Sequence, residues 1–349
     1  MEFTATVIYP RDRYTMQQVD TLLEQENIRR DANLDLTIGL FDQDRLVATG
    51  SYYKNTLRCL AVHKDYQGYA LMNRLVTELL NYQSDLGYDN SFVYTKKETG
   101  KFFESLGFYP IASTEKLVFL ENRNRFENYL NKLKLESEEQ NFPKKERVAS
   151  IVMNANPFTL GHLYLVEKAA SENDLLHLFM VSDDSSLIPF SVREELIRKG
   201  TAHLDNIIYH QTRSYMISRS IFPSYFIKEA DDIIVQQAKL DIRIFSRIAE
   251  TLGIGSRYIG SEPFSRVTNL YNEVMQQDLT EKGIRVHIVP RKEQDDQAIS
   301  ASHVRELIRL GRIDEIQKFV PKSTYKFFCS EAARGIIRQI QKEKDVIHY

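Results

Sequence analysis

The stretch VASIVMNANPFTLGH (residues 148–162) decides the fold of the larger part of this chain. It begins with an apolar run, Val148–Met153, of the kind found in strands that are covered on both faces. A polar turn follows, and helical spacing then continues to Ala170. The alternation recurs downstream, with strands expected at His177–Val181, Ile207–His210, Arg257–Gly260 and Val286–Val289 and helices at Ser191–Lys199, Ala230–Leu252 and Ser302–Leu310. Strands separated by helices predict a parallel, doubly wound α/β/α sheet.

Residues 1–125 have a different pattern, which predicts a smaller α+β domain. Leu34–Leu40 and Leu46–Tyr53 read as a β-hairpin, and Ala70–Tyr82 has the spacing of a helix. Residues 126–146 are crowded with charged and amide side chains around one amphipathic stretch, so we interpret them as a linker. We therefore expect an α+β domain at 1–125, the linker at 126–146 and the α/β domain at 147–349.

The composition narrows the possible function classes. The 349 residues carry 46 basic and 48 acidic side chains, so no overall field attracts nucleic acid or an anionic membrane. No apolar run approaches the roughly 20 residues of a membrane span, and the N-terminus lacks the apolar segment of a signal peptide. Two distant cysteines, Cys59 and Cys329, have no metal-type spacing. We expect a cytoplasmic protein that binds neither nucleic acid nor membrane.

The turn after Val148–Met153 is the first candidate for chemistry. Ligands of open α/β sheets bind outside the carboxyl ends of the strands. Thr159 and His162 share a face of the first helical turn, and Gly161 leaves room for a phosphate at the helix N-terminus. An imidazole and a hydroxyl at this place suit a phosphate under nucleophilic attack. On spacing alone, a simple turn capped by Thr159 explains the segment equally well.

A second candidate is the segment Ile299–Arg305, which follows the expected strand Val286–Val289 and a polar loop. Ser300 and Ser302 at a helix start can cap the helix or present hydroxyl and amide groups to a triphosphate. Arg305 lies in the first turn, where its guanidinium could bind phosphate oxygens. The alternative is an ordinary N-cap followed by an exposed basic face. The functional interpretation requires both helix starts to converge on one triphosphate.

Together the two segments resemble the nucleotidyltransferase superfamily, which has an (H/T)xGH motif and an ISSTxxR motif. Thr159, Gly161 and His162 match the first motif, and the segment from Ile299 to Arg305 matches the second except at Ala301, where the superfamily has a serine. The resemblance implies a Rossmann-like domain that binds ATP with Mg²⁺. It also implies attack on the α-phosphorus with pyrophosphate as the leaving group.

More narrowly, the chain resembles the citrate lyase ligase family over nearly its whole length. The resemblance rests on Met153–Leu165, Val181–Gly200, Arg213–Glu229, Gly260–Asn272 and Ile299–Arg305. The N-terminal domain resembles GNAT acetyltransferases through Val62–Leu75 and Lys101–Phe108. Two positions where those enzymes have small residues beside a pyrophosphate are Ala70 and Met72 here. A bulky Met72 argues against acetyltransferase catalysis and leaves a scaffold or a ligand-binding domain.

The family resemblance implies a function and a set of site residues. The expected reaction joins acetate to ATP as acetyl-adenylate and passes the acetyl group to the phosphopantetheine-type thiol on the acyl-carrier subunit of citrate lyase. Neither cysteine of this chain lies in a motif, so we expect the accepting thiol to belong to another chain. The resemblance to GNAT enzymes, whose fold is built around a CoA-like tether, implies that the N-terminal domain docks the thiol arm. The implied catalytic residues are His162, Thr159 and Arg305, and the implied nucleotide-binding residues are Asn154, Asn156, Phe158, Gly161, Ser300, Ser302, Arg193 and Glu262.

Two other functions remain open at this point. One is an adenylyltransferase whose acceptor is a phosphate ester, such as a pantetheine phosphate. The other is a protein without catalysis that senses a nucleotide or a thioester. Acetate-dependent, phosphate-ester-dependent or absent exchange of pyrophosphate into ATP would separate the three.

Overall fold

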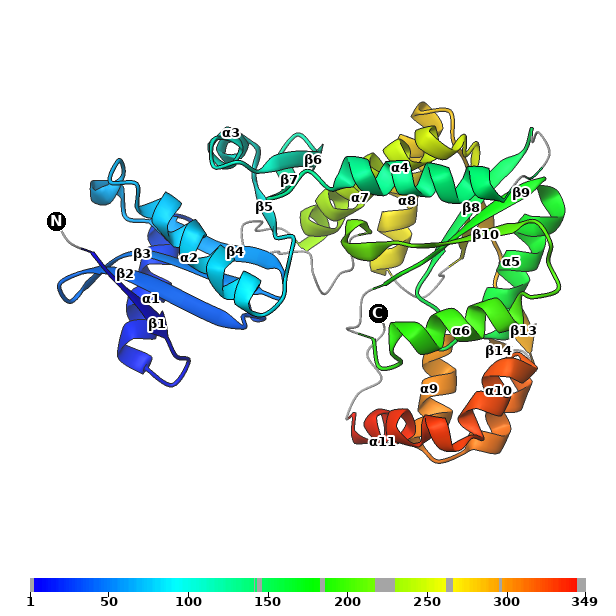
Figure 1. The fold of residues 1–349 in the computed structure, drawn as a ribbon. Helices are drawn as coiled ribbons and strands as arrows, with labels where there is room; N and C mark the ends of the chain where they lie inside the picture. Colours follow the sequence, from blue (N-terminus) through cyan, green and yellow to red (C-terminus); the bar gives the residue numbers. More distant parts are fainter. Residues whose placement is uncertain are drawn as a thin grey trace. The chain divides into compact units, whose positions relative to one another are not determined.

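The computed structural model describes residues 3–140, 142, 146–182, 186–216, 230–261, 266–294 and 297–343. Within these residues the chain forms two compact units (Figure 1). The first contains the chain up to Asn128 and the part of α7 (Ala230–Leu252) that ends at Ile244; the second contains the rest. None of the described helices combines the length and the apolar character that a membrane span requires.

The first unit is built on a seven-stranded mixed sheet in the order β1-β2-β3-β4-β5-β7-β6. Its strands are β1 (Thr4–Ile8), β2 (Leu36–Asp42), β3 (Arg45–Tyr53), β4 (Thr56–Val62), β5 (Phe92–Lys96), β6 (Tyr109–Ser113) and β7 (Leu117–Glu121), and its helices are α1 (Arg13–Gln25), α2 (Leu71–Asp85) and α3 (Lys97–Ser105). All neighbouring strands are antiparallel except β4 and β5. Apolar side chains of β2 to β5 and α2 form the core, among them Leu40, Leu57 and Leu79. The predicted α+β domain is confirmed.

The second unit is built on a five-stranded parallel sheet in the order β10-β9-β8-β11-β12. Its elements are α4 (Phe126–Glu139), β8 (Val148–Met153), α5 (Leu160–Glu172), β9 (Leu175–Met180), α6 (Phe190–Gly200), β10 (Ile207–Gln211), β11 (Ser256–Gly260), α8 (Arg266–Glu281), β12 (Arg285–Val289), β13 (Glu293–Gln294), β14 (Gln297–Ala298), α9 (Ala301–Arg309), α10 (Lys322–Phe328) and α11 (Arg334–Lys342). The strand order reverses between β8 and β11, which makes the end of β8 a switch point where ligands of doubly wound sheets bind. The predicted parallel sheet is confirmed.

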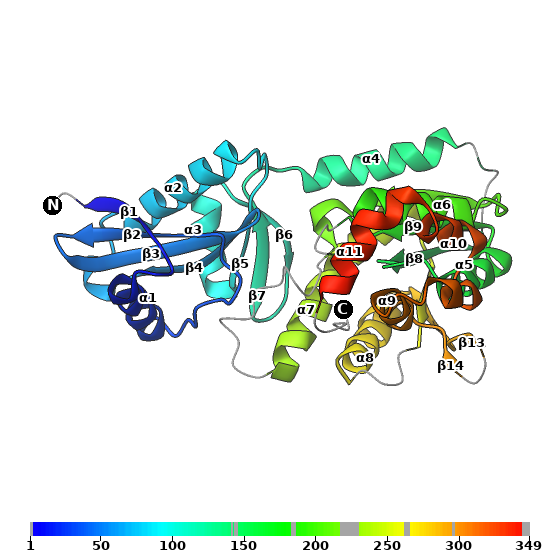
Figure 2. The same cartoon turned by 90° about the horizontal axis from the view of Figure 1, so that it is seen from below.

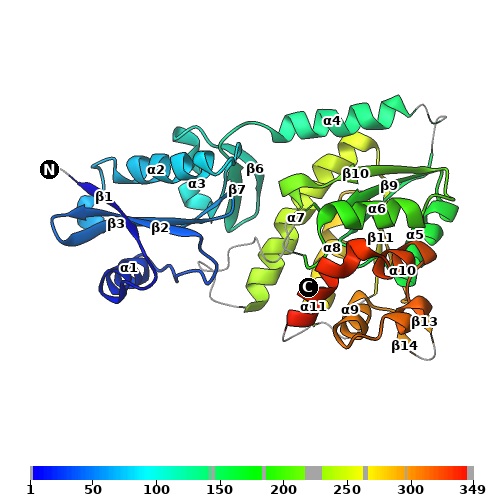
Figure 3. The ribbon, with the colours of Figure 1, turned by 60° about the horizontal axis from the view of Figure 1, so that its bottom comes forward.

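Helices cover both faces of this sheet (Figure 3). Successive residues of a strand point to opposite faces. On β10, the Tyr209 hydroxyl bonds to Thr201 at the end of α6, whereas His210 bonds to Glu136 of α4. Beyond the sheet, α9, α10 and α11 lie together around an apolar cluster of their own (Figures 1 and 2).

The first unit includes part of α7, whereas the expected α/β domain held all of residues 147–349. The helix α4 coincides with the amphipathic stretch of the expected linker. The N-terminal half of α7 belongs to the first unit, because its side chains bond to the segment between β6 and β7: Gln236 to Thr114 (2.6 Å), Asp232 to Lys116 (2.8 Å) and Lys239 to Glu115 (2.9 Å). The amphipathic pattern of residues 230–252 predicts the helix correctly, but it carries no information on which sheet the helix packs against.

Candidate functional site

The loop after β8 is held in place by side chains from three segments. The Asn156 Oδ1 accepts a hydrogen bond from the Ile188 N–H (3.2 Å), and the Asn154 Nδ2 donates to the Ser186 hydroxyl (3.0 Å). Arg193 of α6 is 1 % exposed and donates to the backbone carbonyls of Asn154 (2.9 Å), Val181 (2.7 Å) and Ile188 (2.9 Å), and to the Asn154 side chain. Arg193 thus serves as an internal support for the loop.

The start of α5 orients the imidazole of His162. The Thr159 Oγ1 accepts a hydrogen bond from the His162 N–H (3.3 Å), and the His162 Nδ1 accepts one from the Thr159 N–H (3.1 Å). This is a capping box in which an imidazole takes the place of the usual Glu or Gln. Because Nδ1 is an acceptor, the proton of the neutral ring lies on Nε2. Thr159, 1 % exposed and 2.9 Å from Nδ1, positions His162 through these contacts.

His162 is neutral in this environment. Burial, together with the positive charge of Arg291, lowers the pKa of its imidazole from 6.5 to about 4. The ring lies roughly parallel to that of the fully buried Phe158, with centroids 5.9 Å apart. At neutral pH, His162 therefore offers one N–H donor at Nε2 and carries no charge.

The second segment meets the first at this edge of the sheet. Ser300 caps α9 by accepting a hydrogen bond from the His303 N–H (3.1 Å). Arg305, 4 % exposed, donates to the backbone carbonyl of Asn156 (2.6 Å) and to the Ser302 hydroxyl (3.1 Å). A Cβ on Gly161 would lie 3.1 Å from the carbonyl oxygen of Ile299, so the two helix starts are in direct contact.

The expected site residues divide by exposure. Those that retain exposed surface are Asn154, Gly161, His162, Ser300 and Ser302, whereas those that are buried are Asn156, Phe158, Thr159, Arg193 and Arg305. Glu262 lies outside the described residues. The half-buried group consists of a glycine and polar residues at or next to two helix N-termini, which is an arrangement suited to an anion. The buried group holds that arrangement together.

Arg291 is a residue of this region that the sequence analysis treated only as part of a polar loop. It follows β12, its Nε donates to the carbonyl of Ser261 (3.0 Å) and its N–H donates to the Ser261 hydroxyl (3.2 Å). Its charge acts on His162, as the lowered pKa of that imidazole indicates. The signal in the sequence was an arginine two residues after a strand, in the loop at the carboxyl edge of the expected sheet.

The side chains of this region do not form a metal cage. Among the described residues, no group of three His, Cys, Asp or Glu side chains could hold a metal ion. The described groups are hydroxyl, imidazole, guanidinium and backbone N–H groups, which suit the binding of phosphate oxygens.

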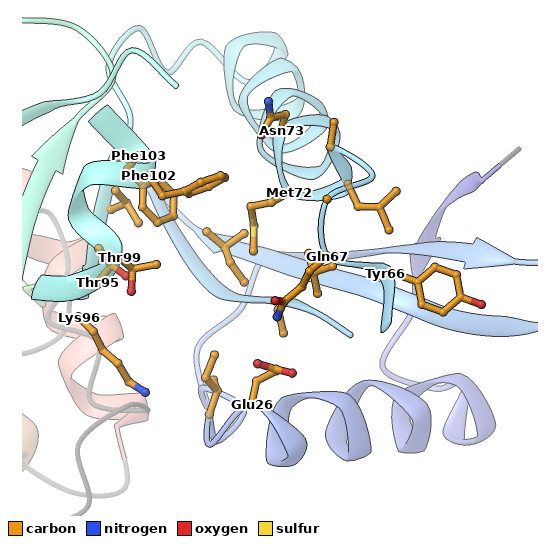
Figure 4. Close-up of a pocket in the computed structure, with 18 of the residues that line it drawn as sticks. Glu26, Tyr66, Gln67, Met72, Asn73, Thr95, Lys96, Thr99, Phe102 and Phe103 are labelled. Atoms are coloured by element: carbon orange, nitrogen blue, oxygen red, sulfur yellow. The ribbon is translucent and has the colours of Figure 1, made fainter. Parts of the chain in front are cut away.

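A separate cavity of about 650 Å³ lies within the first unit (Figure 4). Over the described residues, β4 and β5 pair only at Thr56–Phe92 and Leu57–Val93. Beyond these pairs the strands separate, so their facing backbone edges no longer bond to each other. The cavity occupies this gap, and α2 and α3 supply the rest of its lining.

The cavity has a largely apolar lining. It is lined by Leu60–Val62 of β4, Val93–Lys96 of β5 and the aromatic rings of Phe102 and Phe103. Met72 points into it from the first turn of α2 (Figure 4). The thioether therefore takes up space at a position where the family resemblance would place a small residue.

A doubly wound parallel sheet with two helix N-termini in contact at its switch point is the arrangement of α/β domains that bind nucleotides and other phosphate-bearing ligands. A family model described as the citrate lyase ligase C-terminal domain matches residues 148–328. A relative named citrate (pro-3S)-lyase ligase, from Klebsiella pneumoniae, is 36 % identical over 329 residues, covering 92 % of this chain and 95 % of the relative. A relative of the same name from Escherichia coli is 34 % identical over 320 residues, covering 89 % and 90 %. The chain therefore belongs to the citrate lyase ligase family and is an enzyme of that kind.

Solved structures match a smaller share of the chain. Escherichia coli ElaA is 16 % identical and covers 35 % of this chain and 99 % of its own, with a TM-score of 0.30. A GNAT-family acetyltransferase from Staphylococcus aureus is 12 % identical and covers 34 % and 98 %, also with a TM-score of 0.30.

Proposed function

We propose that this enzyme uses ATP and acetate to acetylate the thiol of the prosthetic group on the citrate lyase acyl-carrier subunit. In the first step an acetate oxygen attacks the α-phosphorus of ATP, the bond to the β-phosphate oxygen breaks and pyrophosphate leaves. In the second step the thiol sulfur attacks the acetyl carbon of acetyl-adenylate, AMP leaves and the thiol proton is released.

The contact between Arg305 and Asn156 is the observation that carries this proposal. It brings the N-termini of α5 and α9 together, and the N–H groups and dipoles of two adjacent helix starts favour the binding of one anion between them. A carboxylate is already a nucleophile and needs no general base. The chemical demand is stabilisation of the charge that develops on the phosphoryl oxygens. The His162 Nε2–H, held in one orientation by Thr159, is suited to donate to an α-phosphate oxygen.

Magnesium would enter this site with the nucleotide. The described side chains offer no carboxylate cluster, whereas Mg²⁺ commonly binds through substrate phosphates and water. The ion would neutralise part of the charge on the triphosphate. The residues of this chain would position the phosphates by hydrogen bonds.

The cavity of the first unit would receive the thiol arm of the carrier. The arm is slender, carries amide groups and ends in a small acyl thioester. The separated edges of β4 and β5 offer backbone groups to amides, and the apolar lining suits the methylene segments. The cationic side chain in the lining is Lys96, so the cavity favours an uncharged arm over one that carries several phosphates.

Exchange of labelled pyrophosphate into ATP tests the reaction class. We expect exchange that requires acetate. Exchange that requires a phosphate monoester would instead identify an adenylyltransferase for a phosphate ester, and ATP binding without exchange would identify a sensor. His162→Ala should lower acetate-dependent exchange by about two orders of magnitude or more, as loss of one oriented donor does elsewhere. His203→Ala, at a half-exposed histidine paired with Glu167, is the matched control and should leave exchange unchanged.

A further inference from the structure

Three titratable side chains that the proposed reaction does not use are linked by hydrogen bonds inside the second unit. His177 of β9 and His210 of β10 are 0 % and 1 % exposed. The His177 Nδ1 lies 2.9 Å from the His210 Nε2, and the His210 Nδ1 lies 2.8 Å from Oε2 of Glu136 on α4. Glu136, His210 and His177 therefore form one hydrogen-bonded network, called the Glu–His–His network below, that connects α4 to two neighbouring strands of the sheet.

The two histidine rings of this network are enclosed by the protein. The His210 ring lies roughly parallel to that of Phe179, with centroids 4.9 Å apart, and to that of His177, with centroids 5.1 Å apart. The Glu136 side chain, at the other end, is 32 % exposed. A proton from solvent therefore reaches the rings from the Glu136 end, where α4 covers the sheet.

Cations approach the network from α4 and from the sheet. The Lys132 ammonium lies 3.4 Å from the Glu136 Oε1. Arg257 of β11, 4 % exposed, lies in one cross-strand row with Ser150 and His177, two strand spacings or roughly 10 Å from His177. Both cations oppose the uptake of further positive charge by the rings. The other groups that face this region are Tyr129 of α4, Arg213 after β10 and the Phe245 ring of α7, whose centroid lies 4.1 Å from the Arg257 guanidinium.

The direction of each hydrogen bond depends on how many protons the two rings carry. The bond from His210 holds the pKa of the Glu136 carboxyl below its ordinary value, so Glu136 is an ionised acceptor and His210 donates from Nδ1. With both rings neutral, His177 donates from Nδ1 to the bare Nε2 of His210. With one added proton, His210 donates from both nitrogens and the His177 Nδ1 accepts. The network is complete in both states.

A second added proton breaks the bond between the rings. The facing nitrogens of His210 and His177 would then both carry a hydrogen, and neither could accept. Two positive rings with centroids 5.1 Å apart would also repel each other in a buried place, where unpaired charge is costly. We propose that the Glu–His–His network is a proton-sensitive latch, which holds α4 on the sheet with at most one added proton and releases it when a second is bound.

The sign of the expected pH dependence follows from these proton counts. The released state binds more protons than the attached state, so attachment weakens as the pH falls. Glu136 acts in the same direction: its pKa is lowered in the folded chain, so its contribution is present above the ordinary value and is lost in acid. Histidine side chains change charge between about pH 5 and 8, which sets the range to examine.

Release should be confined to the part of α4 that carries Glu136. Nearer the start of the helix, the Tyr129 hydroxyl donates to the carbonyl of Gln211 (3.1 Å), and its ring lies 4.9 Å from that of Tyr215. These contacts contain no group that gains a proton in mild acid. Residues 129–131 therefore serve as an internal reference for residues 136–139 of the same helix.

Amide hydrogen exchange of the full chain between about pH 8 and 5 tests the latch. Protection factors are compared, because the intrinsic exchange rate itself varies with pH. His177→Gln supplies an amide that can donate to His210 or accept from it but takes up no proton. His203→Gln, at an exposed histidine paired with Glu167, is the matched control. Nitrogen NMR of histidine-labelled protein counts the ring protons over the same range.

In the unaltered chain we expect protection at residues 136–139 to fall at least ~10-fold from about pH 8 to 5, while residues 129–131 stay protected. His177→Gln should keep this protection at the acid end, and His203→Gln should lose it as the unaltered chain does. A purely structural role predicts that His177→Gln lowers protection equally at every pH and leaves the acid-dependent loss in place. That result would overturn the proposal, and so would loss of protection while NMR shows both rings neutral. Protection that does not change with pH in the unaltered chain would overturn it as well. The inference does not depend on the proposed function.

Discussion

The Arg305 Nη1 donates a 2.6 Å hydrogen bond to the backbone carbonyl of Asn156, which lies 149 residues earlier in the chain. Both groups are buried. The second Nη of the same guanidinium bonds to Ser302, so one side chain connects the loop after β8 to the start of α9. The partners in these two contacts are a carbonyl oxygen and a hydroxyl, so neither contact is an ion pair. The guanidinium instead holds the loop after β8 and the start of α9 at a fixed distance from each other.

Arg305→Lys should separate the two helix starts. A lysine keeps the charge but cannot bond in two fixed directions, so one buried partner loses its donor. We expect a loss of about 1.5–3 kcal/mol in the free energy of unfolding. Pyrophosphate exchange should fall by about 100-fold, since misplacement by about 1 Å has effects of that size. Arg309→Lys, at a residue of the same helix paired with Glu306 near the surface, should change neither property. Unchanged exchange in Arg305→Lys would contradict the organising role.

Gly161→Ala tests the contact between the start of α5 and the residue Ile299, which precedes α9. The new Cβ would lie 3.1 Å from the Ile299 carbonyl oxygen. A backbone atom cannot move aside as easily as the end of a flexible side chain, so the two segments would have to shift apart. Overpacking of this kind costs about 1–3 kcal/mol. We expect a lower midpoint of thermal unfolding and a raised KM for ATP. Gly335→Ala, where a Cβ meets nothing within 4 Å, should leave both unchanged or slightly raise the midpoint.

The lowered pKa of the half-buried His162 imidazole predicts a specific pH dependence of stability. Its pKa in the folded chain, about 4, is below the ordinary value of 6.5, so the unfolded chain takes up the proton first. The free energy of unfolding is therefore unaffected by this group above about pH 6.5 and decreases as the pH falls from 6.5 toward 4. His162→Gln should remove this part of the decrease, whereas His203→Gln should retain it. Nitrogen NMR at pH 7 should show a neutral ring protonated at Nε2; a charged ring would contradict the assignment.

Sequence patterns predicted the elements better than the orientation of individual side chains. Val148–Met153 is β8 to the residue, and Ala230–Leu252 is α7 to the residue, because apolar runs and helical periodicity are local properties. Thr159 and Arg193 were both expected to contact the nucleotide. Arg193 is instead enclosed by carbonyls of Asn154, Val181 and Ile188, and only the tertiary fold brings these groups together. The sequence motif indicates a candidate region, and it does not show which of its residues are enclosed by the protein and which retain surface.

Arg291 and the packing of α7 are two features that the sequence patterns did not predict. Arg291 acts on His162 across 129 positions of sequence, and no short motif encodes that distance. The N-terminal half of α7 pairs with Thr114, Lys116 and Glu115 through polar side chains that a sequence presents as ordinary surface residues. Polar contacts between residues far apart in the chain leave no periodic pattern in the sequence, so only the structure identifies them.

Filling the cavity of the first unit should separate the two half-reactions. Met72→Trp adds volume where Met72 points into the space between β4 and β5. If the carrier arm binds there, acetyl transfer to the carrier should fall at least ~10-fold, which corresponds to ~1.4 kcal/mol, while acetate-dependent pyrophosphate exchange stays unchanged. Asn81→Trp, at an exposed position of the same helix, is the matched control and should alter neither step. Transfer is followed by the mass of the carrier and exchange by labelled pyrophosphate. Equal loss of both steps would indicate general damage, and unimpaired transfer would place the arm elsewhere, since a bulky indole in the gap leaves no room for an extended chain.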